Sequence, residues 1–291
     1  MQAVAAVRRL TGTKKAGHIG TLDPLAEGLL PIALGEATKL IHLLEKSDKT
    51  YVFTVQWGVQ TTTDDREGEP THTSSNRPNQ AQIEAILPQF VGQVQQTPPI
   101  YSAIKVNGKR AYAMARAGAT EAEIGLKSRV VQVFAFKLLQ HNPDSSVFEV
   151  HCGPGTYVRS LARDMGQLLG CYGYVTKLIR TKVGLFCQES KILLETLEKN
   201  GHSASEMWLA APQTGLDDIP ALALQPHEVQ QLRHGMALNW ITKQDSHRLP
   251  SNPEPSQPVI ALAFDGHHVA AVVQVAFGKV QPLRVLHINQ P

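Results

Sequence analysis

The sequence predicts an α+β fold that ends in a small β domain. Segments 51–57, 129–138 and 146–152 are strand-like, the first because its apolar residues alternate with polar ones. Short helical segments are mixed irregularly with these strands, which favours α+β over a doubly wound parallel sheet. The sequence contains no repeat with a fixed period, which argues against solenoids and propellers.

The N-terminal half contains two predicted helices and one clear strand. Residues 3–10 form a helix without a capping residue, and its apolar face consists of Val4, Val7 and Leu10. The strand 51–57 turns one side towards a core, made of Tyr51, Phe53, Val55 and Trp57. Residues 61–80 are polar and turn-rich, which predicts a long connection or an irregular hairpin. Asn79 then caps a short helix that ends at Pro88.

The middle of the chain contains two further helices. Residues 110–117 form a helix that stops at Gly118. The helix over 157–169 has an apolar stripe with helical spacing, which we expect to be buried: Val158, Leu161, Met165 and Leu168. Another face of that helix presents Arg159, Arg163 and Gln167.

A domain boundary is predicted between residues 214 and 215, within a stretch rich in turn-forming residues. Residues 1–214 then form the larger domain and residues 215–291 a small β domain. Within the small domain, 241–258 is a Pro/Ser-rich segment that predicts a flexible loop. The following segment, 259–275, predicts a hairpin with Asp265-Gly266 at its turn.

Composition excludes several classes of protein. Hydrophobic residues make up 42% and charged residues 18% of the 291 residues, which is typical of a globular domain and not of disorder. No apolar run approaches the roughly 20 residues that span a bilayer, and the N-terminus lacks the order of a secretory signal. The cysteines are too few for a disulfide framework or a zinc site: Cys152, Cys171 and Cys187. We therefore expect a soluble cytoplasmic protein without a metal.

Charge is distributed unevenly along the chain. The formal net charge is only +3, yet residues 101–187 carry +7 while residues 51–100 and 188–291 each carry −3. A basic block in a nearly neutral protein is consistent with a surface that binds a polyanion. Ordinary solvated Lys and Arg side chains would explain the same numbers.

Residues 17–39, GHIGTLDPLAEGLLPIALGEATK, admit three interpretations. In the first, Asp23 is a helix N-cap and Pro24 the first helical residue. In the second, His18-Ile19-Gly20 begins the HIGH motif of class I aminoacyl-tRNA synthetases. That interpretation fails because Thr21 replaces the last His and no KMSKS-like segment follows.

In the third interpretation, the segment resembles the catalytic motif of the TruB family of tRNA pseudouridine synthases, GHxGTLDPxAxGxLP…GxATK. Four further segments resemble motifs of that family in the same order: DKTYVFTVQWGVQTTTDDREG (48–68), PPIYSAIKVNGKRAYAMARAG (98–118), CGPGTYVRSLARDMGQLLG (152–170) and LIRTKVGLF (178–186). The resemblance implies a catalytic domain with a central mixed or antiparallel sheet, followed by a PUA-like RNA-binding domain.

One feature departs from the family pattern. Members of the family usually begin with a strand and a DKPxGxTS turn, which precede the helix equivalent to residues 2–11. This chain begins at Met1 inside that element, so we expect that the strand and motif are missing from its start. An absence of DKPxG-like codons in frame upstream of Met1 would contradict this.

The resemblance also implies the reaction and its residues. Family members isomerise uridine 55 in the TΨC loop of tRNA by cleaving the N1–C1′ bond and rejoining the base through C5. This requires no cofactor, and the partner is the T-arm of tRNA, bound by a monomer. By this resemblance, Asp23 matches the catalytic aspartate and Arg159 matches its ion-pair partner. Arginine suits that role, because it stays protonated and binds a carboxylate with two donors.

Other residues match positions that handle the uridine after it leaves the loop. Tyr51 stacks on the everted base and later accepts a proton, as the third catalytic residue. His18, Tyr157 and Leu178 complete the substrate-binding set. Stacking of an aromatic side chain on a splayed loop base is the usual mode of sequence-specific RNA recognition.

Basic residues within and beside the +7 block are candidates for contacts with RNA phosphates: Lys14, Lys15, Lys39, Lys105, Lys109, Arg110 and Arg129. Binding through them would weaken steeply with salt.

Two other functions remain open at this stage. The first is a non-catalytic RNA-binding or RNA-folding protein of the same fold, in which loss of Asp23 would change nothing. The second is a nucleotidyltransferase that uses GHIGT as a phosphate-binding loop, which would require saturable ATP binding.

Overall fold

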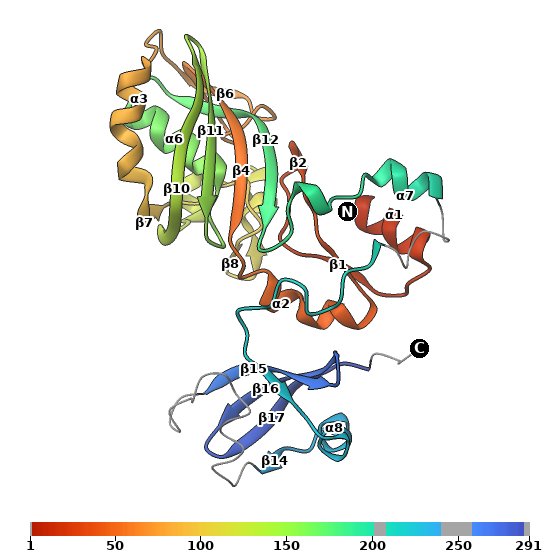
Figure 1. The fold of residues 1–291 in the computed structure, drawn as a ribbon. Coiled ribbons are helices and arrows are strands. Elements are labelled where there is room, and N and C mark those ends of the chain that lie inside the picture. Colours follow the sequence, from red (N-terminus) through yellow and green to blue (C-terminus); the bar gives the residue numbers. More distant parts are fainter. Residues whose placement is uncertain (1, 201–207, 240–257, 288–291) are drawn as a thin grey trace. The chain divides into compact units, whose positions relative to one another are not determined.

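The computed structural model describes residues 2–200, 208–239 and 258–287 (Figure 1). The chain divides into two compact units. The first unit comprises residues 1–20, 31–45 and 192–291, and the second comprises residues 21–30 and 46–191. The segment 21–30, which includes Asp23, therefore belongs to the second unit although its flanking residues belong to the first.

A six-stranded mixed sheet forms the second unit, in the order β2-β12-β4-β11-β10-β7. Its strands are β2 (Ala26–Gly28), β4 (Lys49–Trp57), β7 (Gly92–Gln96), β10 (Arg129–Asn142), β11 (Ser145–Cys152) and β12 (Gly173–Val183). All neighbouring strands are antiparallel except β2 and β12, which are parallel. The mixed sheet and the α+β class that the sequence predicted are thus confirmed.

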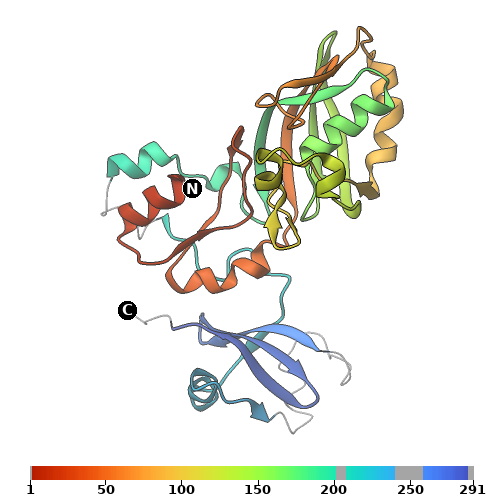
Figure 2. The ribbon, with the colours of Figure 1, turned by 180° about the vertical axis from the view of Figure 1, so that it is seen from behind.

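Two helices cover one face of this sheet, α3 (Gln80–Ile86) and α6 (Val158–Leu168), as Figures 1 and 2 show from opposite sides. Asn79 caps α3 as predicted, because its side chain accepts a hydrogen bond from the Gln82 amide (2.9 Å). In α6, the buried stripe differs from the expectation at one position. Leu168 is 52% exposed, because it is the last residue of the helix.

Smaller elements complete the second unit. They are β5 (Val59–Thr61), β6 (Pro70–Thr73), η2 (Leu87–Phe90), β8 (Lys105–Val106), β9 (Lys109–Arg110), α4 (Ala111–Arg116), α5 (Glu121–Ile124) and η3 (Gln188–Ser190). Strands β5 and β6 pair with a register shift. Of the two predicted alternatives for residues 61–80, the irregular hairpin is confirmed, although its first strand begins earlier, at Val59.

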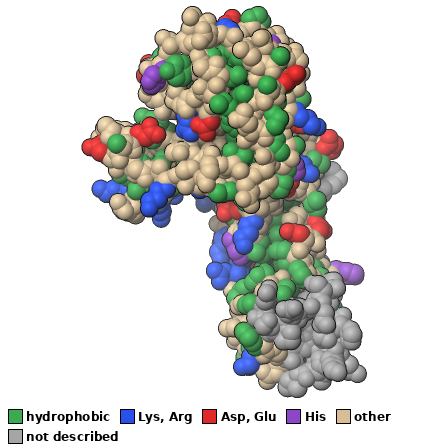
Figure 3. Space-filling view, turned by 90° about the vertical axis from the view of Figure 1, so that its left-hand side faces the viewer, with side chains coloured by type: hydrophobic (Ala, Val, Ile, Leu, Met, Phe, Trp, Pro, Cys, Tyr) green, Lys and Arg blue, Asp and Glu red, His purple; other side chains and the backbone are tan. Residues whose placement is uncertain are grey.

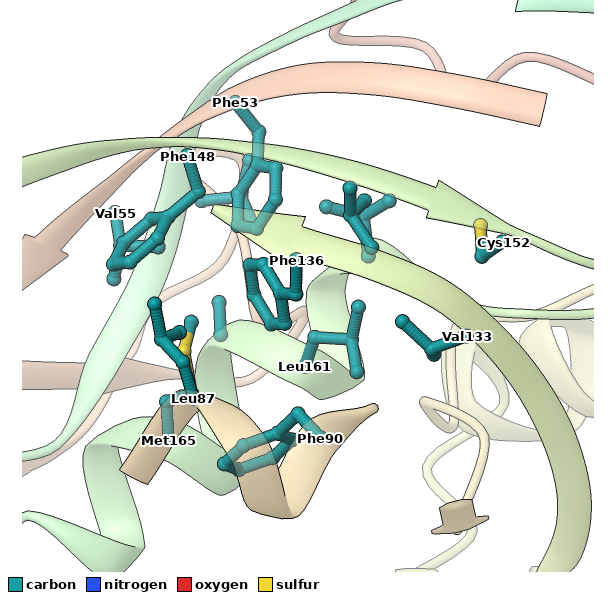
Figure 4. Packing of buried hydrophobic residues seen from close by; sticks show 14 of the residues in the cluster. Phe53, Val55, Leu87, Phe90, Val133, Phe136, Phe148, Cys152, Leu161 and Met165 are labelled. Carbon is teal, nitrogen blue, oxygen red and sulfur yellow. The ribbon is translucent and has the colours of Figure 1, made fainter. Parts of the chain in front are cut away.

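Aromatic rings fill the core between the sheet and the two helices (Figure 4). Phe148 lies at its centre, with its ring centroid 5.5 Å from that of Phe53, 5.6 Å from that of Phe136 and 6.2 Å from that of Trp57. Leu161 and other apolar side chains of α6 pack against these rings. This packing fixes α6, and with it the polar face of the helix, against the sheet.

The first unit contains one small sheet and one larger one. Its N-terminal part holds α1 (Gln2–Thr11), β1 (Ala16–His18), β3 (Ile32–Leu34), η1 (Gly35–Leu40) and α2 (Ile41–Leu44). Strands β1 and β3 pair antiparallel. Helix α7 (Leu194–Asn200) lies beside α1, and Glu198 is 4.0 Å from Arg9.

The C-terminal β domain is a five-stranded sheet in the order β13-β15-β16-β17-β14. Its elements are β13 (Ala221–Ala223), α8 (Pro226–Arg233), β14 (Leu238–Asn239), β15 (Val259–Asp265), β16 (His268–Ala276) and β17 (Lys279–Val285). The predicted hairpin at Asp265-Gly266 is confirmed. The predicted flexible loop 241–258 falls almost entirely outside the described residues, and the boundary at 214/215 stays a prediction.

We expect Phe148→Ala to lower the free energy of unfolding by about 3–5 kcal/mol, because it removes the ring at the centre of the core. Phe134→Ala is the matched control, since Phe134 lies on the adjacent strand but is 51% exposed. That change should cost less than about 1 kcal/mol. Urea denaturation followed by tryptophan fluorescence measures both, and equal losses would contradict this account of the core.

Candidate active site

Asp23 lies in a tight turn and not at the start of a helix. The amide of Ala26 donates to the Asp23 carbonyl (2.9 Å), and β2 begins directly after this turn. The helix-cap interpretation of Asp23-Pro24 is therefore wrong; the same dipeptide also suits the first two positions of a β-turn. Leu25 anchors the turn in the core. The parallel pairing of β2 with β12 then fixes where the Asp23 side chain emerges.

Asp23 forms a two-point ion pair with Arg159 of α6. Arg159 Nε donates to Oδ2 (2.8 Å) and Nη2 donates to Oδ1 (3.0 Å). The Arg159 side chain is 5% exposed and that of Asp23 is 28% exposed. An arginine keeps its proton even when buried, so the pair places a fixed positive charge against the carboxylate. The partial exposure of Asp23 leaves that carboxylate accessible to another molecule.

Arg159 is itself held from several sides. Nη1 donates to the Thr63 carbonyl (3.0 Å) and Nη2 donates to the Tyr101 carbonyl (3.2 Å). Nε also lies 3.7 Å from Oδ2 of Asp65, whose side chain is 4% exposed. The guanidinium therefore has little freedom to turn, and the direction of its donors towards Asp23 is fixed.

Asp65 belongs to an acidic loop, residues 61–69, whose conformation is closely defined. Its Oδ1 accepts hydrogen bonds from the Thr63 hydroxyl (2.5 Å) and from the Glu67 amide (3.0 Å). Backbone groups of the loop also form two hydrogen bonds with Val175 of β12 (2.9 and 3.1 Å). The loop is thus attached to the sheet through its backbone and to α6 through its side chains.

A second arginine of α6, Arg163, holds the other acidic residue of this loop. Its Nη1 lies 3.1 Å from Oδ2 of Asp64, its Nη2 donates to the Thr97 carbonyl (2.8 Å), and its Nε donates to Asp164 (2.8 Å). Burial raises the pKa of Asp64 to about 6, although Arg163 and Arg159 lower it. The charge of Asp64 is therefore only partly compensated.

Tyr51 lies beside this network on β4. It is directly opposite Arg180 of β12 in the antiparallel register, and the Arg180 side chain hydrogen-bonds to its phenol. Arg180 is 1% exposed and its Nε donates to the Leu29 carbonyl (2.8 Å), just beyond β2. Burial raises the pKa of Tyr51, and the charge of Asp23 adds to that rise. The phenol is thus protonated at neutral pH.

Leu178 and Tyr157 occupy different environments in the same unit. Leu178 is 3% exposed and belongs to the core. Tyr157 directly precedes α6, where Gln96 binds its backbone: the Tyr157 amide donates to Oε1 (2.8 Å) and Nε2 donates to the Tyr157 carbonyl (3.1 Å). The guanidinium of Arg129 lies 5.3 Å from the Tyr157 ring centroid.

Two of the expected phosphate contacts already have internal partners. Arg129 is half-buried and donates to the Gly155 carbonyl in addition to covering the Tyr157 ring. Lys39 pairs with Glu36 (2.6 Å) and donates to the carbonyl of Val285 (2.7 Å). Neither is the free surface cation that the sequence suggested, because sequence does not show which neighbours a basic residue meets.

The remaining basic candidates are exposed: Lys14, Lys15, Lys105, Lys109 and Arg110. The last three lie on one two-stranded hairpin of the second unit, β8–β9. On the face seen in Figure 3, Lys and Arg side chains form small groups separated by uncharged surface. His18 belongs to the first unit, as do Lys14 and Lys15. The Nδ1 atom of His18 is buried and has no hydrogen-bond partner among the described residues.

Sequence reasoning missed four polar residues of this site, Asp64, Asp65, Gln96 and Arg180. A signal existed for the first two, since the TTTDD stretch lies inside a segment that resembles a family motif. Arg180 likewise lies within LIRTKVGLF, another segment that resembles a family motif. Gln96 lies outside those segments, on a strand, β7, that was not predicted. Within the described ranges, no group of three His, Cys, Asp or Glu side chains could hold a metal ion. No helix in those ranges is long and apolar enough to cross a membrane.

Comparison with known proteins agrees with this architecture. The archaeal box H/ACA sRNP Nop10–Cbf5 complex contains a chain that superposes with a TM-score of 0.71, at 20% identity over 98% of this chain and 81% of the other. The model of the TruB family pseudouridylate synthase N-terminal domain matches residues 8–158. The model of the tRNA pseudouridylate synthase B C-terminal domain matches residues 159–219.

Closer relatives cover nearly the whole chain. The tRNA pseudouridine synthase B of Caulobacter vibrioides is 45% identical over 99% of this chain and 92% of its own length. That of Rhodopseudomonas palustris is 48% identical over 99% of this chain and 77% of its own length. The fold is therefore that of a pseudouridine synthase. Within this class, the chain belongs to the TruB family.

We expect Asp64→Asn to stabilise the protein at pH 7.5, on the order of 2 kcal/mol. In the folded protein the pKa of Asp64 is about 6, compared with its ordinary value of 3.8. The carboxyl therefore binds its proton more tightly in the folded chain than in the unfolded chain. Its ionised form therefore opposes folding above pH 6, and this cost disappears as pH falls from 6 towards 3.8. Urea denaturation at several pH values measures the difference between variant and wild type. A difference that grows on acidification would contradict the assignment.

Proposed function

We propose that the protein converts uridine 55 in the TΨC loop of tRNA to pseudouridine. Membership of the TruB family makes it a pseudouridine synthase, and its relatives are named for action on tRNA. The observation that carries the proposal is the two-point Arg159–Asp23 pair, which presents a partly exposed carboxylate beside Tyr51. The T-arm as binding partner, a monomeric state and a cytoplasmic location are further predictions of the same proposal.

In this proposal Asp23 acts on a uridine that has left the stacked loop. Eversion of a base costs a few kcal/mol of stacking, and contacts with Tyr51 and Tyr157 offset that cost. Leu178 stays a predicted substrate contact, which its 3% exposure does not favour. The reaction breaks the N1–C1′ bond and forms a C5–C1′ bond without redox change. Asp23 can attack C1′, add to the base or remove a ribose proton. Each route uses the carboxylate that Arg159 holds in place.

In this scheme the phenol of Tyr51 is neutral. A neutral phenol suits stacking on a neutral base, and the hydrogen bond with Arg180 fixes the angle of the ring. We further propose that, after the new C5–C1′ bond has formed, its hydroxyl oxygen accepts the proton from C5 while its own proton passes to water. His18 stays a predicted substrate contact near a phosphate, and the exposed basic side chains would bind further phosphates.

The first test compares Asp23→Asn with wild type on an unmodified tRNA transcript. We expect the variant to lose turnover by at least about a thousandfold, because an amide cannot replace the carboxylate. Its Kd for the tRNA should stay within about threefold of wild type. Carbodiimide adduct formation and primer extension locate the product.

Asp144→Asn serves as the control, since it removes an exposed carboxylate paired with Arg77 in the same unit. Its turnover should equal that of wild type. Turnover by Asp23→Asn at the wild-type rate would contradict the role of Asp23. Wild-type binding of tRNA without any modification would instead support the RNA-binding alternative.

A second test replaces Tyr51 with Phe, which keeps the ring and removes the hydroxyl. If the hydroxyl takes part in proton transfer, single-turnover rates should fall by about 10²–10⁴-fold while the Kd for tRNA is unchanged. A rate close to that of wild type would restrict Tyr51 to stacking.

A further inference from the structure

Arg163 makes an arrangement of contacts that the reaction described above does not use. It lies one helical turn after Arg159, so both guanidinium groups project from the same side of α6. Its side chain is 12% exposed, and its three nitrogen atoms each have a partner. One partner, Asp164, is on the same helix, whereas Asp64 and the Thr97 carbonyl lie on two other segments.

Those two segments are the ones that also hold Arg159. Asp64 lies between Thr63 and Asp65, which contact Arg159 through a carbonyl and a carboxylate. Thr97 lies at the start of the segment that ends at Tyr101, whose carbonyl accepts from Arg159 Nη2. The two arginines therefore grip neighbouring residues of the same two segments. A shift of either segment at Arg163 would move the partners of Arg159.

Asp64 also adopts a backbone conformation that needs support. Its φ is +58°, in the left-handed region that non-glycine residues rarely occupy. Its side chain is 7% exposed, so the carboxylate has lost most of its hydration. A buried ion pair of this kind contributes little to folding but can select one conformation. The contact with Arg163 thus holds the acidic loop in a shape that would otherwise be disfavoured.

We propose that Arg163 is a positioning residue for pseudouridine formation. By holding Asp64 and the Thr97 carbonyl, it keeps the acidic loop and residues 97–101 in the places where they orient Arg159 towards Asp23. The inference rests on the proposed function, because it assigns Arg163 a part in that reaction. Arg163 acts through Arg159 and does not touch the uridine.

Stability and reaction rate measured on an Asp64 variant distinguish a positioning role of Arg163 from a purely structural one. Arg163, Arg159 and Asp164 face the Asp64 carboxyl, and burial raises its pKa to about 6. Neutralising Asp64 should therefore stabilise the fold while weakening the grip on the loop. Greater stability combined with slower chemistry is expected only if the pair is kept for positioning.

The experiment measures single-turnover rates on the tRNA transcript at pH 7.5 with saturating enzyme. Arg163→Gln should lower the rate about tenfold with the Kd for tRNA within about twofold. Asp64→Asn should lower the rate several-fold, and the double variant should be no slower than the slower single variant. Arg163→Lys should recover only part of the rate, since one ammonium cannot bridge both segments.

Gln167→Ala is the matched control, because Gln167 lies one turn further along the same face of α6 and is exposed. Its rate should equal that of wild type. A rate for Arg163→Gln within twofold of wild type, or additive losses in the double variant, would overturn the inference. The proposed function would still stand in that case, since wild-type turnover is measured alongside.

If wild type produces no pseudouridine, the proposed function fails, and hydrogen exchange tests separately whether Arg163 holds the acidic loop. The amides of Asp64, Arg66 and Gly68 form hydrogen bonds within the loop or with β12. Arg163→Gln should speed their exchange about tenfold if the arginine holds the loop, whereas Gln167→Ala should not. Unchanged exchange in Arg163→Gln would overturn the inference.

Discussion

A carboxylate that must stay ionised beside a hydrophobic core requires a cation that cannot lose its proton, and the second unit is organised around that requirement. Arg159 meets it with two parallel hydrogen bonds to Asp23. An unsupported arginine at this depth would be costly, because burial of an unpaired charge costs several kcal/mol. The Thr63 and Tyr101 carbonyls and Asp65 supply the remaining contacts. The aromatic core around Phe148 holds α6 in register beneath them.

The site is consequently distributed over segments that are far apart in the chain. The turn with Asp23, the acidic loop and residues 97–101 all contact α6 through the side chains of Arg159 and Arg163. Strand β12 links them further, since it pairs with β2 and with β4 and also binds the acidic loop through Val175. Tyr51 and Arg180 lie opposite each other across β4 and β12. The geometry of the reacting groups therefore depends on the register of a single strand.

Much of the fold could be predicted from periodicity. The apolar stripe of α6 and the apolar–polar alternation of β4 each predict one buried face. The structure agrees with both predictions except at Leu168. Asp23-Pro24 could not be decided locally, because a helix start and a β-turn favour the same pair. The motif resemblance pointed to Asp23 and Arg159, and the structure brings the two together. The same resemblance covers Asp64 but does not reveal its contact with Arg163. Gln96 lies outside the matching segments, so its contact with the Tyr157 backbone could not be predicted.

The close pairing of β2 with β12 limits which residues the segment next to Asp23 can contain. Strand β2 pairs with the edge of β12 so closely that a methyl group at Gly28 would lie 2.2 Å from the Arg180 carbonyl oxygen. Glycine is thus required at position 28. The three residues of β2, close to Asp23, cover part of the edge of β12. An open strand rim invites pairing with other chains. Variants that loosen this segment would uncover the edge of β12 at Leu178–Arg180 and expose it to such pairing.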